Sequence, residues 1–144
     1  MEDKKVVLKV GGSLLYDDNI RLNTEFLAKF ISWYKKKSKE YNKIVIVVGG
    51  GKLSRYFVNE VDQLELEQVE KHTLAMHITT LNARMIRELL NEAGSEEQIC
   101  YPKTFGEALE SVLDDDVRAI VNGGFIIGSV SYTHLRAHET VLDL

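Results

Sequence analysis

Five consecutive aliphatic residues, Ile44 to Val48, lead directly into three glycines at positions 49–51. A strand with one solvated face alternates apolar and polar side chains, whereas a strand covered on both faces is apolar throughout. Glycine directly after such a run marks the tight loop in which the strand ends. The run therefore predicts a central parallel strand with helices on both sides, which restricts the chain to the α/β class.

Two further short runs end in glycine pairs, residues 5–10 before Gly11-Gly12 and residues 117–121 before Gly123-Gly124. Apolar residues at helical spacing predict helices over 22–40, 53–61, 74–89 and 105–113, and residues 98–101 are predicted to form a strand that Pro102 closes. Right-handed crossovers place the helices on both faces of such a sheet. The order predicts a three-layer αβα sandwich with a mostly parallel sheet, and ligands gather at the carboxyl ends of its strands.

Net charge and cysteine content indicate which partners and which compartment to expect. The chain has 144 residues, a length typical of one domain, and its formal charge of −4 gives no electrostatic reason to expect attraction to nucleic acid or anionic lipid. The single cysteine, Cys100, rules out an internal disulfide framework and fits a reducing compartment. The start of the chain lacks the layout of a signal peptide, and no apolar run is long enough to span a bilayer. We therefore expect a cytoplasmic protein.

The segment 130–144 differs from the rest of the chain. Its first part, VSYTHLRAHET at 130–140, resembles a translated transposon-type sequencing adapter, and we predict that the segment is not native. His134 and His138 have the i, i+4 spacing that can hold a metal ion on a helix, and Glu139 adjoins them. Because this pair lies wholly inside the suspect segment, no metal site is predicted.

Two familiar phosphate motifs are ruled out by single residues. A Walker A loop needs glycine five residues before its Gly-Lys pair, and Ile46 stands there. A dinucleotide fingerprint that starts at Gly49 needs glycine at position 54, where the chain has Ser54. Neither a P-loop NTPase nor a nicotinamide enzyme is supported.

The glycine loops themselves have the chemistry of a phosphate site. Glycines expose backbone N–H groups, and at a helix N-terminus these groups and the helix dipole favour an anion. Lys9 can supply a positive charge to a phosphoryl group during transfer. Arg55 can bind a second phosphate through its guanidinium group, which donates two parallel hydrogen bonds. Phosphoryl transfer needs little beyond such positioning and charge neutralisation. The alternative for each glycine cluster is a tight turn and nothing more.

Three motifs together resemble those of the amino acid kinase superfamily, and in particular UMP kinases of the archaeal type. They are Lys-x-Gly-Gly-Ser at 9–13, Val-Val-Gly-Gly-Gly-Lys-Leu-x-Arg at 47–55, and the helix segment from Ile78-Thr79 to Asn82-Ala83. Acetylglutamate and isopentenyl phosphate kinases usually carry a histidine where this chain has Val48. The resemblance covers residues 5–129 and implies that residues 1–129 are the N-terminal, acceptor-binding part of a kinase domain whose C-terminal half is missing.

The resemblance also implies roles for single residues and a reaction. By it, Lys9 stabilises charge during transfer, Gly11, Gly12 and Ser13 cradle the ATP phosphates, Gly50, Gly51 and Arg55 hold the phosphate of UMP, and Gly123 and Gly124 line the transfer site. The reaction of these kinases converts UMP and ATP to UDP and ADP with the help of Mg²⁺. The full-length protein is expected to be a homo-oligomer, a hexamer being one such form, and the chain without the adenine-binding half is expected to be inactive.

Two departures leave the acceptor open. His72 stands where these kinases generally have an aspartate that contacts the nucleotide, and Ala75 stands at the following glycine position. The alternatives are a kinase of the same superfamily for a carboxylate or an isoprenoid phosphate, and a non-catalytic nucleotide-binding regulatory subunit. His72 and His77 are predicted to point to different faces of one helix, one partly exposed and the other packed.

Overall fold

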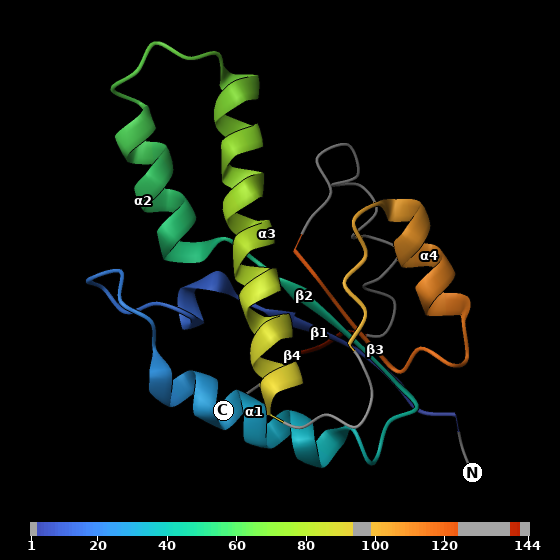
Figure 1. The fold of residues 1–144 in the computed structure, drawn as a ribbon. Helices are drawn as coiled ribbons and strands as arrows, with labels where there is room; N and C mark the ends of the chain where they lie inside the picture. The colour runs from blue at the N-terminus through green and yellow to red at the C-terminus, as the bar shows by residue number, and fades with distance from the viewer. Residues whose placement is uncertain (1–2, 94–98, 124–138, 142–144) are drawn as a thin grey trace.

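The structure, a computed structural model, describes residues 3–93, 99–123 and 139–141 (Figure 1). Its elements in chain order are β1 (Lys5–Val10), the 3₁₀ helix η1 (Gly12–Leu14), α1 (Thr24–Lys37), β2 (Lys43–Val48), α2 (Gly51–Val61), α3 (Gln68–Glu92), α4 (Phe105–Leu113), β3 (Ala119–Asn122) and β4 (Glu139–Val141). The alternation of strands with helices confirms the predicted α/β class.

The four described strands form one parallel sheet in the order β3-β2-β1-β4. β2 lies inside this sheet and is buried at all six positions, as its unbroken aliphatic run predicts. Because every pairing is parallel, the loops that follow β1, β2 and β3 emerge at the same edge of the sheet. The prediction that the glycine clusters gather at this edge is therefore confirmed for β1, β2 and the first glycine after β3.

Helices cover the sheet on both faces. α1 and α3 pack on one face, where Phe30 and Ile86 join Leu8 and Ile46 in the larger apolar core. The opposite face carries a smaller cluster of Val7, Val45, Val47 and Ile120, which Val112 of α4 joins. This arrangement confirms the three layers predicted from the sequence.

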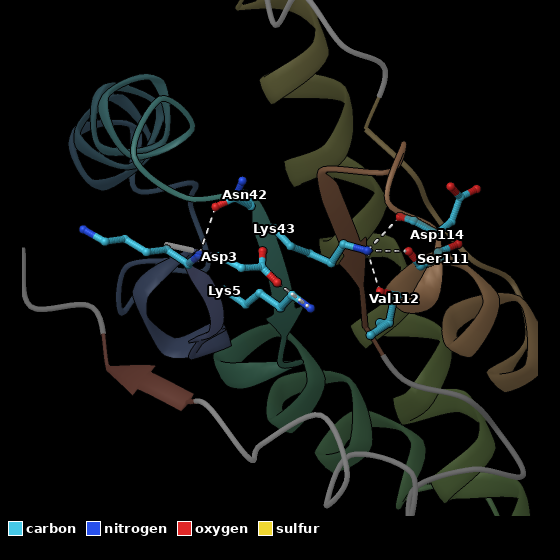
Figure 2. Close-up of polar contacts among 8 residues, drawn as sticks. Asp3, Lys5, Asn42, Lys43, Ser111, Val112 and Asp114 are labelled. Atoms are coloured by element: carbon cyan, nitrogen blue, oxygen red, sulfur yellow. Dashed lines mark hydrogen bonds and ion pairs between the residues drawn. The ribbon is translucent and has the colours of Figure 1, made fainter. Parts of the chain in front are cut away.

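A buried lysine attaches α4 to the sheet. Lys43 starts β2, and its Nζ donates hydrogen bonds to the carbonyl oxygens of Ser111 at 3.1 Å and Asp114 at 2.8 Å, as well as to that of Val112 (Figure 2). These carbonyls lie at the carboxyl end of α4, where the last turn has no partners within the helix and the helix dipole favours a cation. Lys43 therefore satisfies the end of α4 and holds it against β2.

Several element bounds differ from the prediction for local reasons. α1 begins at Thr24 because Asn23 caps it, its side chain accepting from the N–H of Phe26 at 3.1 Å. The predicted strand at 98–101 is reduced to a single parallel bridge between Cys100 and Ile120, just before Pro102, and residue 98 lies outside the described residues. β3 starts at Ala119, since the preceding residues complete the turn after α4.

α3 is longer than predicted and begins at Gln68. Its first turns run beside α2, and both helices extend past the ends of β1 and β2 (Figure 1). The apolar stripe used for the prediction begins only at Leu74, so the polar first turns escaped it. Among the described helices, none combines the length and the apolar character needed to cross a membrane.

The segment predicted to be non-native lies mostly outside the described residues, His134 and His138 included. Its one described part is β4, which pairs in parallel with β1 through Val7↔Glu139, Leu8↔Thr140 and Lys9↔Val141. The non-native origin of residues 130–144 stays a prediction.

Candidate functional site

The loops after β1 and β2 touch each other through their backbones. A Cβ on Gly12 would lie 2.4 Å from the nitrogen of Gly51, and a Cβ on Gly51 would lie 2.0 Å from the carbonyl carbon of Gly12 and 2.3 Å from the nitrogen of Ser13. Real Cβ atoms essentially never come within 3.0 Å of a neighbour. Glycine is therefore required on both sides, and the two loops form one continuous backbone surface.

The β2 loop, residues 49–51, has the geometry of an anion nest. Gly50 is right-handed, with φ −83° and ψ −36°, and Gly51 follows with a positive φ of 57°. A right-handed residue followed by a left-handed one turns successive N–H groups toward one concavity, and here that concavity begins helix α2, whose dipole also favours negative charge. Within the described part of the chain, neither Gly50 nor Gly51 donates its N–H to a hydrogen bond.

The β1 loop, residues 11–13, adds two more free donors. It turns into η1, in which Leu14 and Leu15 donate their N–H groups to the carbonyls of Gly11 and Gly12 at 3.0 and 3.1 Å. The N–H groups of Gly12 and Ser13 precede these bonds and have no acceptor among the described residues. The touching loops therefore present four free backbone donors, the arrangement that binds phosphate groups in proteins.

A buried asparagine from α3 supports the β2 loop from behind. The side chain of Asn82, which is 0% exposed, donates from Nδ2 to the carbonyls of Gly49 and Gly50 at 3.0 and 3.2 Å. Its Oδ1 accepts a hydrogen bond of 2.8 Å from the hydroxyl of Tyr16, which follows η1. Burial raises the pKa of the Tyr16 hydroxyl, so that it stays a donor.

The loop after β3 approaches the same part of α3. A Cβ on Gly123 would lie 2.5 Å from the carbonyl oxygen of Thr79, and a Cβ on Gly50 would lie 2.9 Å from the hydroxyl oxygen of Thr79. The predicted meeting of three glycine-containing strand ends is thus seen for Gly12, Gly50 and Gly123, whereas Gly124 lies outside the described residues.

The two cationic side chains predicted for the site, Lys9 and Arg55, are exposed and belong to different parts of the fold. Lys9 lies in register with Val47, on the sheet face opposite α3, whereas Arg55 belongs to α2, which packs against α3. Neither forms a hydrogen bond or ion pair with any residue that the structure describes. Their convergence on one ligand stays a prediction. Lys52, next to the nest, is instead paired with Asp18 at 2.9 Å.

The expectation for the histidines of α3 is wrong in one respect, because His72 and His77 are both exposed. Both precede Thr79 in α3, the residue that lies against Gly50 and Gly123 at the strand ends. Across the described residues, no three His, Cys, Asp or Glu side chains come together in a way that could hold a metal ion.

Sequence reasoning missed a second buried amide, that of Asn122 at the end of β3. It is 1% exposed, and within the described structure neither its Nδ2 nor its Oδ1 has a hydrogen-bond partner. Parallel registers place Asn122 beside Val47 and Val47 beside Lys9, in one row across the carboxyl end of the sheet. The available signal was an asparagine between a run of apolar strand residues and a glycine pair.

Comparison with known proteins was decisive for the family, since the chain matches the Amino acid kinase family over residues 4–135. The chain belongs to this family. Membership of this family agrees with the parallel sheet and with the glycine loops at one of its edges. The matched span ends inside the segment 130–144.

Several members of the family are similar to this chain over most of its length. The uridylate kinase of Archaeoglobus fulgidus is 32% identical over 124 residues, which cover 86% of this chain and 51% of that protein. The uridylate kinase of Methanococcoides burtonii is 29% identical over 126 residues, covering 88% and 50%. The chain spans about half the length or less of the curated relatives it matches.

Solved structures agree with this assignment. The crystal structure of the uridylate kinase from Archaeoglobus fulgidus matches with a TM-score of 0.64 at 28% identity, over 83% of this chain and 50% of that one. The UMP kinase from Bacillus anthracis matches with a TM-score of 0.65 over 84% of this chain and 52% of that one, and at 20% identity this likeness concerns the fold alone.

Proposed function

We propose that this chain is the acceptor-binding half of a UMP kinase, which transfers the terminal phosphoryl group of ATP to UMP and yields UDP and ADP. The observation that carries the proposal is the contact between the β1 and β2 loops, which brings together N–H groups from both that have no acceptor among the described residues. The similarity to uridylate kinases supports UMP as the acceptor.

The roles proposed for single residues come from the family resemblance, and the contact of the two loops supports them. The nest at Gly50 and Gly51 holds the phosphate of UMP, and the N–H groups of Gly12 and Ser13 hold phosphates of ATP. Lys9, at the end of β1, neutralises charge that develops during transfer. Donor and acceptor phosphates are then held by neighbouring backbones, which brings the reacting groups together at little entropic cost.

Magnesium is proposed to reach the site with ATP. In kinases this ion takes most of its ligands from substrate phosphates and water, with one or two protein carboxylates. The described residues contain no cluster of three acidic, histidine or cysteine side chains that could hold a metal ion by itself. The residues present do not make a magnesium site on their own, and the proposed roles of Lys9 and the glycine loops do not depend on one.

Binding of UMP to the chain tests the proposal. We expect UMP to bind by calorimetry and Arg55→Ala to weaken it by about tenfold, because a charge-assisted hydrogen bond contributes about 1.5–3 kcal/mol. Arg84→Ala is the matched control, since Arg84 is also an exposed arginine but belongs to α3. Equal affinities for UMP and uridine would argue against a phosphate site. The chain alone is expected to form no UDP from UMP and ATP.

His72 is exposed and therefore accessible to a ligand, which favours a second candidate function, a kinase for an acceptor other than UMP. A histidine in place of the usual aspartate changes the charge and hydrogen bonding offered to a nucleoside, while the phosphate loops are left as they are. A kinase for another phosphorylated acceptor, such as an isoprenoid phosphate, would bind inorganic phosphate through the same nest but show no preference for UMP. Comparing the two ligands with a panel of phosphorylated compounds separates the candidates.

A further inference from the structure

We infer that Asn82 and Tyr16 are positioning residues, which together set the direction of the N–H groups that receive the acceptor phosphate. The inference rests on the proposed function, because it assigns a purpose to the nest. Both side chains are buried, and neither is free to contact a ligand directly. They act through the backbone of the β2 loop.

Peptide geometry explains how Asn82 acts. In a trans peptide the C=O and the N–H of the same plane point in opposite directions. The carbonyl of Gly49 shares a plane with the N–H of Gly50, and the carbonyl of Gly50 shares one with the N–H of Gly51. Asn82 Nδ2 donates to both carbonyls, at 3.0 and 3.2 Å, and draws them toward α3; the carbonyl of Gly50 also accepts from the Ser54 N–H at 3.3 Å, whereas that of Gly49 depends on Asn82. Both N–H groups consequently point away from α3, where they are free to meet an anion.

The two loop carbonyls can only accept, so they select Nδ2 of Asn82, and Tyr16 holds the other end of the amide. An asparagine side chain can rotate and exchange its oxygen and nitrogen, and the rotated form would direct Oδ1 at two carbonyl oxygens. The Tyr16 hydroxyl donates to Oδ1 at 2.8 Å, which favours the form that presents Nδ2 to Gly49 and Gly50. Because Tyr16 closely follows η1, this chain of hydrogen bonds joins the β1 loop, the β2 loop and α3.

The inference differs from a purely structural role in what it predicts. Removing any buried hydrogen bond lowers stability. A positioning role further requires that the direction of the Gly50 and Gly51 N–H groups, and with it phosphate affinity, depends on Asn82 and Tyr16. The amide resonances of these two glycines report on that direction in solution, with or without ligand.

The test uses Asn82→Asp and Tyr16→Phe, with inorganic phosphate and UMP as probes and the amide resonances of Gly50 and Gly51 as the readout. Aspartate has nearly the shape of asparagine but has no N–H to donate to the loop carbonyls when ionised. We expect Asn82→Asp to shift both glycine resonances in the free protein and to weaken UMP binding by at least tenfold. Tyr16→Phe is expected to weaken it by about threefold to tenfold.

Tyr101→Phe is the matched control. Tyr101 also donates its hydroxyl to α3, to the carbonyl of Thr80 at 3.4 Å, and burial raises its pKa as it does that of Tyr16. Its removal is expected to leave UMP affinity and the two glycine resonances unchanged. Urea unfolding of each variant shows how much stability it loses, so that loss of folding is not mistaken for loss of binding.

The outcomes separate the inference from the proposed function. Wild-type resonances and UMP affinity in folded Asn82→Asp and Tyr16→Phe would overturn the inference. If the wild type binds neither UMP nor phosphate, the proposed function fails, whereas a change of the Gly50 and Gly51 resonances in ligand-free variants still supports the positioning role. If Asn82→Asp does not fold, the comparison of Tyr16→Phe with Tyr101→Phe decides.

Discussion

Two asparagines are buried at the carboxyl edge of the sheet, and their surroundings are opposite. Asn82 is 0% exposed and makes hydrogen bonds with Tyr16, Gly49 and Gly50. Asn122 is 1% exposed, and within the described residues its side chain makes none. A satisfied buried amide stabilises one arrangement of its neighbours, whereas an unpaired buried group costs about 1–3 kcal/mol.

The difference separates two strand ends at the same edge of the sheet, those of β2 and β3. At the end of β2, the buried amide of Asn82 has all its partners within the chain. The groups that lack a partner among the described residues are the N–H groups of Gly50 and Gly51. At the end of β3, a buried amide has no partner in the described structure, so a further group is needed there. The chain spans about half the length of the curated relatives it matches, and the partner of the Asn122 side chain is not among the described residues.

The most severe way to break the region at the end of β2 is Gly51→Ala. The new Cβ would meet the Gly12 backbone at 2.0 Å and would stand on a residue with φ 57°. We expect the free energy of unfolding to fall by about 3 kcal/mol or more, from the clash and the left-handed backbone together. Urea unfolding measures this. Gly11→Ala is the control, because its Cβ would find its nearest atom at 3.6 Å, and an equal loss there would contradict the explanation.

Asn82→Leu is expected to have the next largest effect. Leucine has the same number of side-chain heavy atoms but leaves the Tyr16 hydroxyl and the carbonyl of Gly49 without a hydrogen-bond partner among the described residues, while the carbonyl of Gly50 keeps only the Ser54 N–H at 3.3 Å. The expected loss is about 2–4 kcal/mol in the free energy of unfolding, read from denaturant titration. A variant as stable as the wild type would mean that these hydrogen bonds are replaced by others.

The same substitution at Asn122 is expected to act in the opposite direction. Asn122→Leu removes two buried polar atoms that have no partner among the described residues and keeps the number of side-chain heavy atoms. In this chain the free energy of unfolding is expected to rise by about 1 kcal/mol. Loss of stability similar to that of Asn82→Leu would show that Asn122 does have partners, and the comparison between the two sites would fall.

The smallest effect concerns pH and Tyr16. Burial raises the pKa of its hydroxyl above the ordinary value of 10.0, so the folded chain keeps a proton that the unfolded chain loses. The corresponding stability is full below about pH 10 and is lost as the pH rises through the folded pKa. We expect the free energy of unfolding to fall more steeply between about pH 9 and pH 11 in the wild type than in Tyr16→Phe. Parallel slopes would indicate that Tyr16 ionises equally in both states.

Much of the fold followed from the sequence because its signals are local. The unbroken aliphatic run before Gly49 identified β2 as an interior strand, and the glycines after β1, β2 and β3 located the edge of the sheet where the loops lie. The bridge at Cys100 was overestimated as a strand, since a short apolar run does not reveal how many of its residues pair. The exposure of His77 was missed, since helical spacing does not show which faces of α3 the rest of the chain covers.

The site was predicted less completely than the fold. Sequence motifs pointed to Gly12 and Gly51 as phosphate-binding positions, but their contact arises only when the two strands pair in register. Asn82 was noticed as part of a family motif, while its hydrogen bonds to the β2 loop depend on how α3 crosses the sheet. Tyr16 and Asn122 carry no distinctive spacing, and only their buried surroundings reveal them.

The contact of Gly12 with Gly51 also limits how the protein can change by mutation. When two side chains collide, a smaller residue at either position restores the fit. Here both partners already lack a side chain, so a replacement at one position cannot be compensated at the other. Genetic suppressors of such a change must therefore lie outside the pair, in segments whose movement would separate the two loops.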